Sequence, residues 1–176
     1  MGRTEREAVA SASGRPGLKG ILMSMQTEFY MDRERAQIGQ KVDSMLAAVV
    51  SVTSNGQAPI PFGALVVFDD NDAFLCKLPV PKAPLDKPIG ITLRQFHCEN
   101  YQPKSSIAAM RKGRVWVQSE KVDAAGDAVY VKLLDNGSHI FTGAKTGNAQ
   151  LKGAIFLEKT EGGKVPIEVN FFGGAQ

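Results

Sequence analysis

Arg-Val-Trp-Val-Gln-Ser-Glu-Lys-Val-Asp-Ala-Ala-Gly-Asp-Ala-Val-Tyr-Val-Lys-Leu-Leu, residues 114–134, is the stretch that decides the fold. Two runs of β-branched and aromatic residues flank a polar turn at Gly126-Asp127. This arrangement is typical of a strand, a loop and a second strand. Val115 and Val117 share one face of the first run, because successive side chains of a strand point to opposite faces. The stretch carries no catalytic signature.

Further strands are indicated on both sides of this stretch. The run at 64–68 is apolar on both faces, which indicates a strand that is covered on both sides. Asp135-Asn136-Gly137-Ser138 is typical of a hairpin turn. The remaining candidate strands are 89–93, 139–142, 154–158 and 165–171. Seven or eight short strands predict a mainly β fold: a small antiparallel β-barrel or sandwich with an extended N-terminal arm.

The first fifty residues divide into two kinds of sequence. Residues 1–20 are polar and rich in Gly and Pro, so they predict an arm outside the core. Apolar residues then recur at helical spacing over 38–49, but Gly39 interrupts them and 49–53 is β-branched. We expect a strand near 48–53 after an irregular or briefly helical segment. The predicted organisation is an extended N-terminal arm, 1–38, and a single β-rich domain, 39–176.

Composition and charge argue against a membrane protein or an exported protein and give little support for a nucleic-acid partner. The 21 basic and 18 acidic residues give a net charge of +3 and are scattered, so charge argues only weakly for a nucleic-acid partner. We expect no membrane partner, since no apolar run approaches the about 18 residues of a span. Residues 1–20 have no apolar core of an export signal, so Cys76 and Cys98 are expected to be reduced thiols.

The residues that could carry chemistry do not form a recognisable site. His97 and Cys98 are adjacent, and on a strand their side chains would point to opposite faces. Together with Cys76 and His139 they also lack the closely spaced pairs of a zinc site. We therefore predict a protein without catalytic residues, metal or cofactor.

Nucleic-acid binding is the alternative that the residues leave open. Aromatic and basic residues could form a platform on which single-stranded bases stack, as in an oligonucleotide-binding barrel. The same aromatic residues could instead fill a small β core. The residues concerned are Phe96, Tyr101, Trp116, Tyr130, Arg94, Arg111, Lys112 and Arg114.

The order of short motifs over residues 39–135 resembles the structural cement, or capsid decoration, proteins of tailed bacteriophages. The motifs begin with Gly39-Gln40-Lys41-Val42-Asp43 and continue through Val49-Val50-Ser51-Val52, Ile60-Pro61-Phe62-Gly63, Ile89-Gly90-Ile91-Thr92, the strand at 111–117 and Ala125-Gly126-Asp127-Ala128-Val129-Tyr130-Val131. Two features depart from the family pattern: Val42 replaces a small residue, and the proline-rich loop 79–88 has the character of an insertion.

The resemblance implies a non-enzymatic virion protein that is assembled in the host cytoplasm. It would bind the outer capsid surface and bridge subunits of the major capsid protein. It would act as a homo-oligomer, a dimer or trimer that matches a two- or three-fold axis. The arm and the 79–88 loop supply the candidate contact residues, which are Arg15, Lys19, Phe29, Tyr30, Arg33, Arg35, Lys82 and Lys87.

Overall fold

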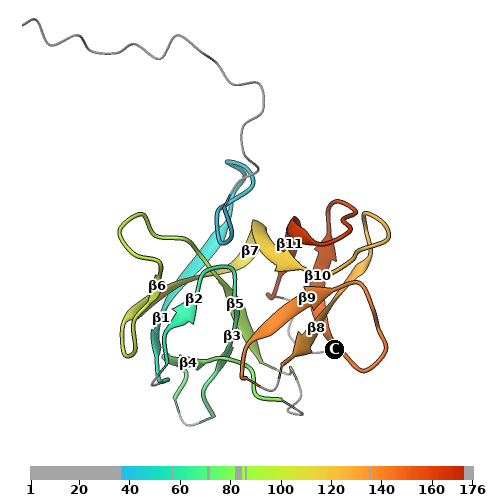
Figure 1. Ribbon diagram of the computed structural model, residues 1–176. Helices are drawn as coiled ribbons and strands as arrows, with labels where there is room; N and C mark the ends of the chain where they lie inside the picture. The colour runs from blue at the N-terminus through green and yellow to red at the C-terminus, as the bar shows by residue number, and fades with distance from the viewer. Residues whose placement is uncertain are drawn as a thin grey trace, which may run out of the picture. The chain divides into compact units, whose positions relative to one another are not determined.

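The fold is all-β in the computed structural model, which describes residues 37–56, 58–70, 72–81, 85, 87–134 and 136–172. Eleven strands lie in these residues (Figure 1). They are β1 (Ala48–Ser54), β2 (Ile60–Pro61), β3 (Leu65–Phe68), β4 (Leu75–Lys77), β5 (Pro88–Thr92), β6 (Asn100–Tyr101), β7 (Ser106–Ser119), β8 (Ala128–Leu133), β9 (His139–Thr142), β10 (Ala149–Phe156) and β11 (Gly163–Asn170).

Five strands close into a first barrel. Its order is β1-β4-β3-β5-β7, and β7 pairs with β1 again to complete the ring. The β1–β4 pairing is parallel and the other pairings of this ring are antiparallel. The predicted small β-barrel is thus confirmed, with a mixed sheet.

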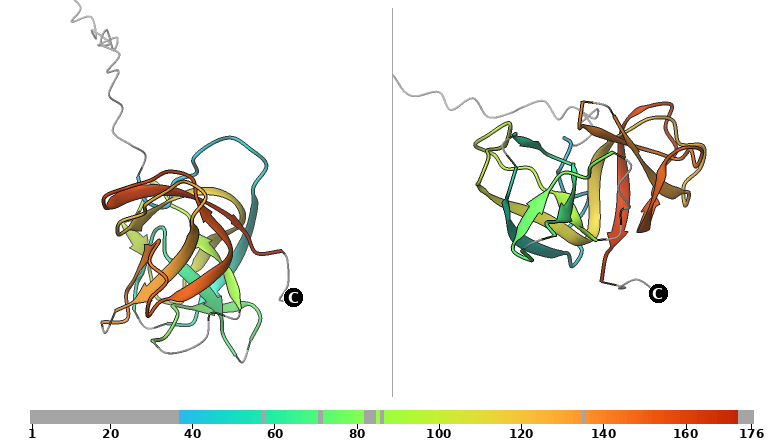
Figure 2. Two further views of the ribbon diagram at one scale, coloured as in Figure 1. Left: turned by 90° about the vertical axis from the view of Figure 1, so that its right-hand side faces the viewer. Right: turned by 90° about the horizontal axis from the view of Figure 1, so that it is seen from below.

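The remaining long strands form a second ring on the other half of β7. Strands β11, β10, β8 and β9 follow β7 in order, and Ser119 of β7 pairs with Phe141 of β9 to close it. Residues 106–112 of β7 pair with β1, and residues 112–119 pair with β11. Figure 2 shows the two groups of strands on either side of β7. One strand of 14 residues therefore belongs to both rings.

Each ring encloses its own apolar core. Val66, Cys76 and Ala109 belong to the core of the first ring, whereas Leu65 and Met110 pack with the core of the second. Residues that are adjacent in sequence therefore pack into different cores, because successive side chains of a strand point to opposite faces. This confirms that the apolar run at 64–68 is covered on both sides.

The predicted strands and turns at 48–53, 89–93, 114–120, 128–134, 139–142 and the last hairpin are confirmed. The approach to the first strand is irregular, with no helix among the described residues before β1. The described chain joins the sheet at Gly39, whose N–H donates to the Trp116 carbonyl at 2.7 Å. The boundary predicted at 38/39 stays a prediction.

Gly90 of β5 lies where the first ring closes onto β7. A Cβ at this position would lie 2.5 Å from the carbonyl oxygen of Met110, closer than side-chain carbons approach backbone atoms. The β5–β7 contact therefore requires a residue without a side chain.

His139, the first residue of β9, connects the two rings. Its Nε2 accepts a hydrogen bond of 2.8 Å from the backbone N–H of Leu65 in β3. Part of the residue reaches the surface, but its Nδ1 atom is buried and has no partner among the described residues. Burial lowers the pKa of His139 from 6.5 to about 4, so the ring is neutral at pH 7 and Nε2 is free to accept.

We predict that Gly90→Ala destabilises the fold by about 1–3 kcal/mol, because the new methyl group overpacks the β5–β7 contact. Gly56→Ala is the matched control: its Cβ would meet its nearest atom at 3.6 Å. The free energy of unfolding from urea titration measures both effects. Equal midpoints for the two variants would contradict the close approach.

We also predict a loss of stability on acidification that His139 causes. Its pKa is lower in the folded state than in the unfolded chain, so protons favour unfolding. Stability is full above pH 6.5 and falls as the pH drops towards 4, by about 2 kcal/mol between pH 7.5 and pH 5. His139→Gln should remove this dependence, and the same change at the exposed His97 should leave it in place. A His139→Gln protein with the wild-type pH profile of urea unfolding would refute the assignment.

Candidate functional site

The predicted contact residues fall mostly outside the residues that the structure describes. This applies to Arg15, Lys19, Phe29, Tyr30, Arg33, Arg35 and Lys82. Lys87 is described: it is exposed directly before β5, and its carbonyl accepts a hydrogen bond of 3.1 Å from the N–H of Phe68. All eight remain predictions.

The histidines and cysteines have separate surroundings. His97 is exposed in a turn, and the Cys98 thiol contacts Gln95 Oε1 at 3.6 Å. Cys76 is buried in the first core, where burial raises the pKa of its thiol to about 11. Within the described ranges no three His, Cys, Asp or Glu residues gather as metal ligands. No described helix has the length and apolar character to cross a membrane.

Tyr101 is not available to the alternative stacking platform. Tyr101 is 2% exposed, packs edge-on against Phe62 and donates its hydroxyl to the Leu93 carbonyl at 2.8 Å. It belongs to the first core, whereas Phe96 is 99% exposed in the turn that follows β5. Tyr101 therefore has no face free for a base, which favours the core role of this aromatic residue.

A cleft lies between the two rings. Its volume is about 360 Å³, and it is lined by side chains from the segment before β1, the β2–β3 region and the hairpin before β9. Most lining residues are apolar, including Ile38, Pro61, Phe62 and Phe141. His139 also lines it, and its imidazole Nε2 already accepts a hydrogen bond from the N–H of Leu65.

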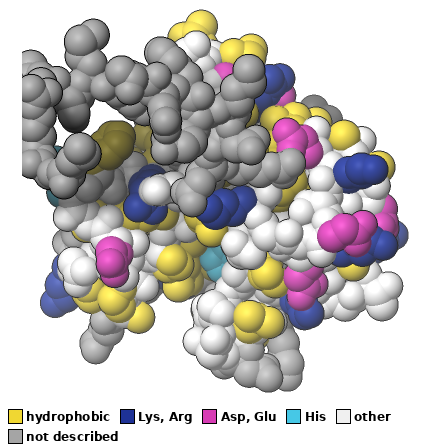
Figure 3. Space-filling model, turned by 45° about the horizontal axis from the view of Figure 1, so that its top comes forward, with side chains coloured by type: hydrophobic (Ala, Val, Ile, Leu, Met, Phe, Trp, Pro, Cys, Tyr) yellow, Lys and Arg dark blue, Asp and Glu magenta, His cyan; other side chains and the backbone are white. Residues whose placement is uncertain are grey.

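The described surface is mixed in charge. Basic and acidic side chains lie close to one another on the face drawn in Figure 3, with apolar side chains between them. The exposed large apolar side chains are Met45, Leu46, Val49, Phe74, Val80, Phe96, Leu134, Ile155 and Phe172. Met45 and Leu46 are adjacent in sequence and precede Val49, which lies on β1. We call the segment of residues 42–47 the 42–47 loop.

The 42–47 loop leaves β7 at a defined point. Lys41 pairs with Val115 of β7, and the N–H of Val42 donates to the Arg114 carbonyl at 3.0 Å. The chain then turns: Asp43 Oδ1 accepts from the N–H of Met45 at 3.1 Å, an Asx-type bond that short polar residues favour. Ala47 returns to pack against the second core.

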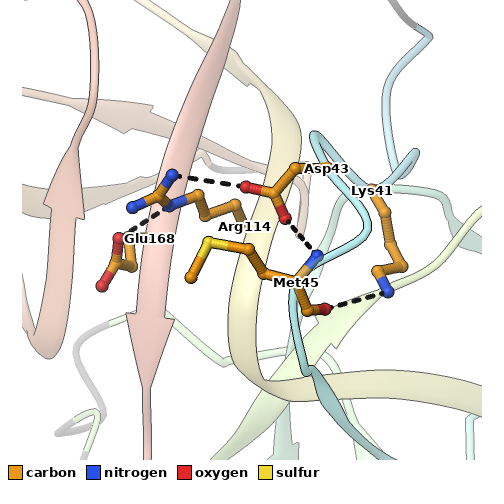
Figure 4. Close-up of polar contacts among 5 residues, drawn as sticks. All are labelled: Lys41, Asp43, Met45, Arg114 and Glu168. Carbon is orange, nitrogen blue, oxygen red and sulfur yellow. Dashed lines mark hydrogen bonds and ion pairs between the residues drawn. The ribbon is translucent and has the colours of Figure 1, made fainter.

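Arg114 ties this loop to β11. Its Nε donates to Glu168 Oε2 at 2.8 Å, and its Nη1 donates to Asp43 Oδ2 at 3.3 Å (Figure 4). The hydrogen bond that Arg114 donates to Glu168, together with the negative charges of Glu168 and Asp43, raises the pKa of Arg114. The guanidinium thus stays charged and connects three segments: the loop, β7 and β11.

Sequence reasoning did not select Met45 and Leu46 as contact residues. Their spacing with Ile38, Val42 and Val49 fits the buried face of a helix, but Leu46 is 98% exposed. The useful signal in the sequence is Gly39, which interrupts the helical spacing; in the structure it has a φ of 80°, a conformation that glycine adopts readily.

Known proteins resemble the chain at two levels. The family model described as "Structural cement protein (E217 gp24/Pam3 gp6)" matches residues 25–170. A solved chain from "The capsid of Myoviridae Phage XM1" is similar in fold, with a TM-score of 0.64 and 17% identity, over 85% of this chain and 99% of that chain. No curated protein matches.

The family match covers most of the chain, from the segment before the sheet to the last residue of β11. It extends the motif order that the sequence carries over 39–135. Cement proteins of this family are structural and non-enzymatic. The chain belongs to the phage structural cement protein family and is a component of a phage capsid.

Proposed function

We propose that this protein binds the outer surface of the capsid and bridges neighbouring subunits of the major capsid protein. The family match over residues 25–170 carries the proposal. The two rings share strand β7 and therefore form a single folded body. Such a body can contact two capsid subunits at once and resist their separation. A cement protein needs a single folded body that makes several contacts with its partners.

The proposed assembly is a homo-oligomer, a dimer or a trimer. A closed oligomer on a symmetry axis presents the same contact surface to each surrounding capsid subunit. Each contact is then modest in free energy, while the assembly binds tightly because its contacts act together.

The proposed contact regions are the segment before residue 39 and the 79–88 loop. Basic side chains at Arg15, Lys19, Arg33 and Arg35 and the aromatic pair Phe29-Tyr30 would clamp a neighbouring subunit. Lys82 and Lys87 would add contacts from the loop. Aromatic and arginine side chains are enriched where protein interfaces are strongest.

Adding the purified protein to undecorated shells of the same phage's major capsid protein should raise the temperature at which the shells disrupt. The cause is preferential binding to the intact shell, which stabilises it by mass action. Differential scanning calorimetry of shells with and without the protein measures the shift. Shells that neither bind the protein nor gain stability would contradict the proposal.

Deleting residues 1–20 should weaken attachment to shells and leave the melting temperature of the protein itself unchanged. The segment holds Arg15 and Lys19 and no part of the described cores. Co-sedimentation with shells and circular dichroism test the two parts. Full attachment of the truncated protein would show that these residues are not contacts.

A further inference from the structure

We infer that the 42–47 loop is a capsid-contact surface, in which Leu46 inserts into an apolar pocket of the capsid protein. The inference rests on the proposed attachment to the capsid and names one surface that would make it. It follows from three properties of the loop: its exposed apolar side chains, its fixed conformation and its size.

The loop exposes apolar side chains next to one another. Leu46 is 98% exposed, Met45 60% and Val49, on the adjoining start of β1, 46%. Single apolar residues on a surface are common and carry little meaning. Here Met45 and Leu46 are adjacent in sequence and both exposed. Polar side chains would fit at these exposed positions equally well, so packing within the protein does not explain the apolar ones.

The conformation of the loop is fixed at several points. The hydrogen bond from Val42 to Arg114 holds its start, and the packing of Ala47 on the second core holds its end. Between these points Asp43 contacts both Arg114 and the backbone of Met45 (Figure 4). A loop that is already ordered loses little conformational entropy on binding, so its exposed side chains are efficient anchors.

The hollow beside the loop is smaller than the usual site for a small-molecule ligand. Met45 and Leu46 line it together with Arg114, Glu168 and Asn170, and its volume is about 100 Å³. Sites for small molecules occupy roughly 300–1,000 Å³. A hollow of this size beside a protruding leucine fits side chains of a partner protein.

The size of the surface also distinguishes between partners. Two or three exposed side chains cover a small part of the roughly 800 Å² per partner that a stable dimer buries. The loop alone therefore does not support a stable self-association. The loop can instead be one of several contacts with a larger partner. A capsid subunit beneath a cement protein is such a partner, because it is bound at several places at once.

The test compares variants in binding to undecorated shells of the same phage's major capsid protein. Leu46→Ser should weaken binding about tenfold or more, because the leucine side chain that the capsid protein would bury is replaced by a small polar one. Leu46→Met, which keeps an apolar side chain of similar volume, should bind within about threefold of the wild type. All variants should unfold at the wild-type temperature, since the side chain touches no core.

Phe74→Ser is the control for general stickiness. Phe74 is 79% exposed in the β3–β4 turn, at the far end of β1 from the loop, where Thr53 pairs with Leu75. Its loss should leave binding unchanged. Arg114→Met removes the ion pair that holds Asp43 and should weaken binding to a smaller degree than Leu46→Ser.

The outcomes separate the two claims. Shells that bind the wild type and Leu46→Ser equally would overturn the role of the loop and leave the attachment to the capsid in place. An equal loss for Phe74→Ser would overturn it as well, because the effect would not depend on the loop. If the wild type does not bind, the proposed function fails, and the inference that depends on it fails too.

Discussion

Strand β7 has two sets of hydrogen-bonding partners, and the rest of the structure depends on this sharing. Its first half pairs with β1 and β5, and its second half pairs with β11. The chain changes partners around Gly113, which has a φ of 134°, a conformation that side chains disfavour. A Cβ there would also lie 3.0 Å from Met110 Sδ and 3.1 Å from Ala47 Cβ. The passage between the rings therefore requires glycine.

The 42–47 loop follows from the same constraint. Beyond the N-terminal end of β1, the edge of β7 that does not face β11 pairs instead with Lys41 and Val42. Arg114 lies directly after Gly113 and so reaches both the loop and Glu168 of β11. An exposed ion pair contributes little to stability, typically less than about 1 kcal/mol. Its importance here is geometric, because it fixes the loop that carries Leu46.

Much of the fold could be predicted because its signals are local. The alternation of Val115 and Val117, the turn at 135–138 and the last hairpin lie within single stretches of sequence. The full length of β7 could not, since no local pattern extends the strand at 111–117 back to Ser106, and that part pairs with β1, which lies far away in the sequence. The hydrogen bond from Leu65 to His139 joins residues 74 positions apart, so no pattern within a short stretch of sequence could predict it. The exposure of Leu46 was equally hidden, because its spacing matches a helix.

The central claim is that the protein is a cement that joins capsid subunits from outside. Cryo-electron microscopy of shells incubated with the protein tests it most directly. We expect density for two fused β-barrels on the outer surface, in contact with at least two major capsid subunits. Density on the inner surface, or on a single subunit with no contact to its neighbour, would contradict it.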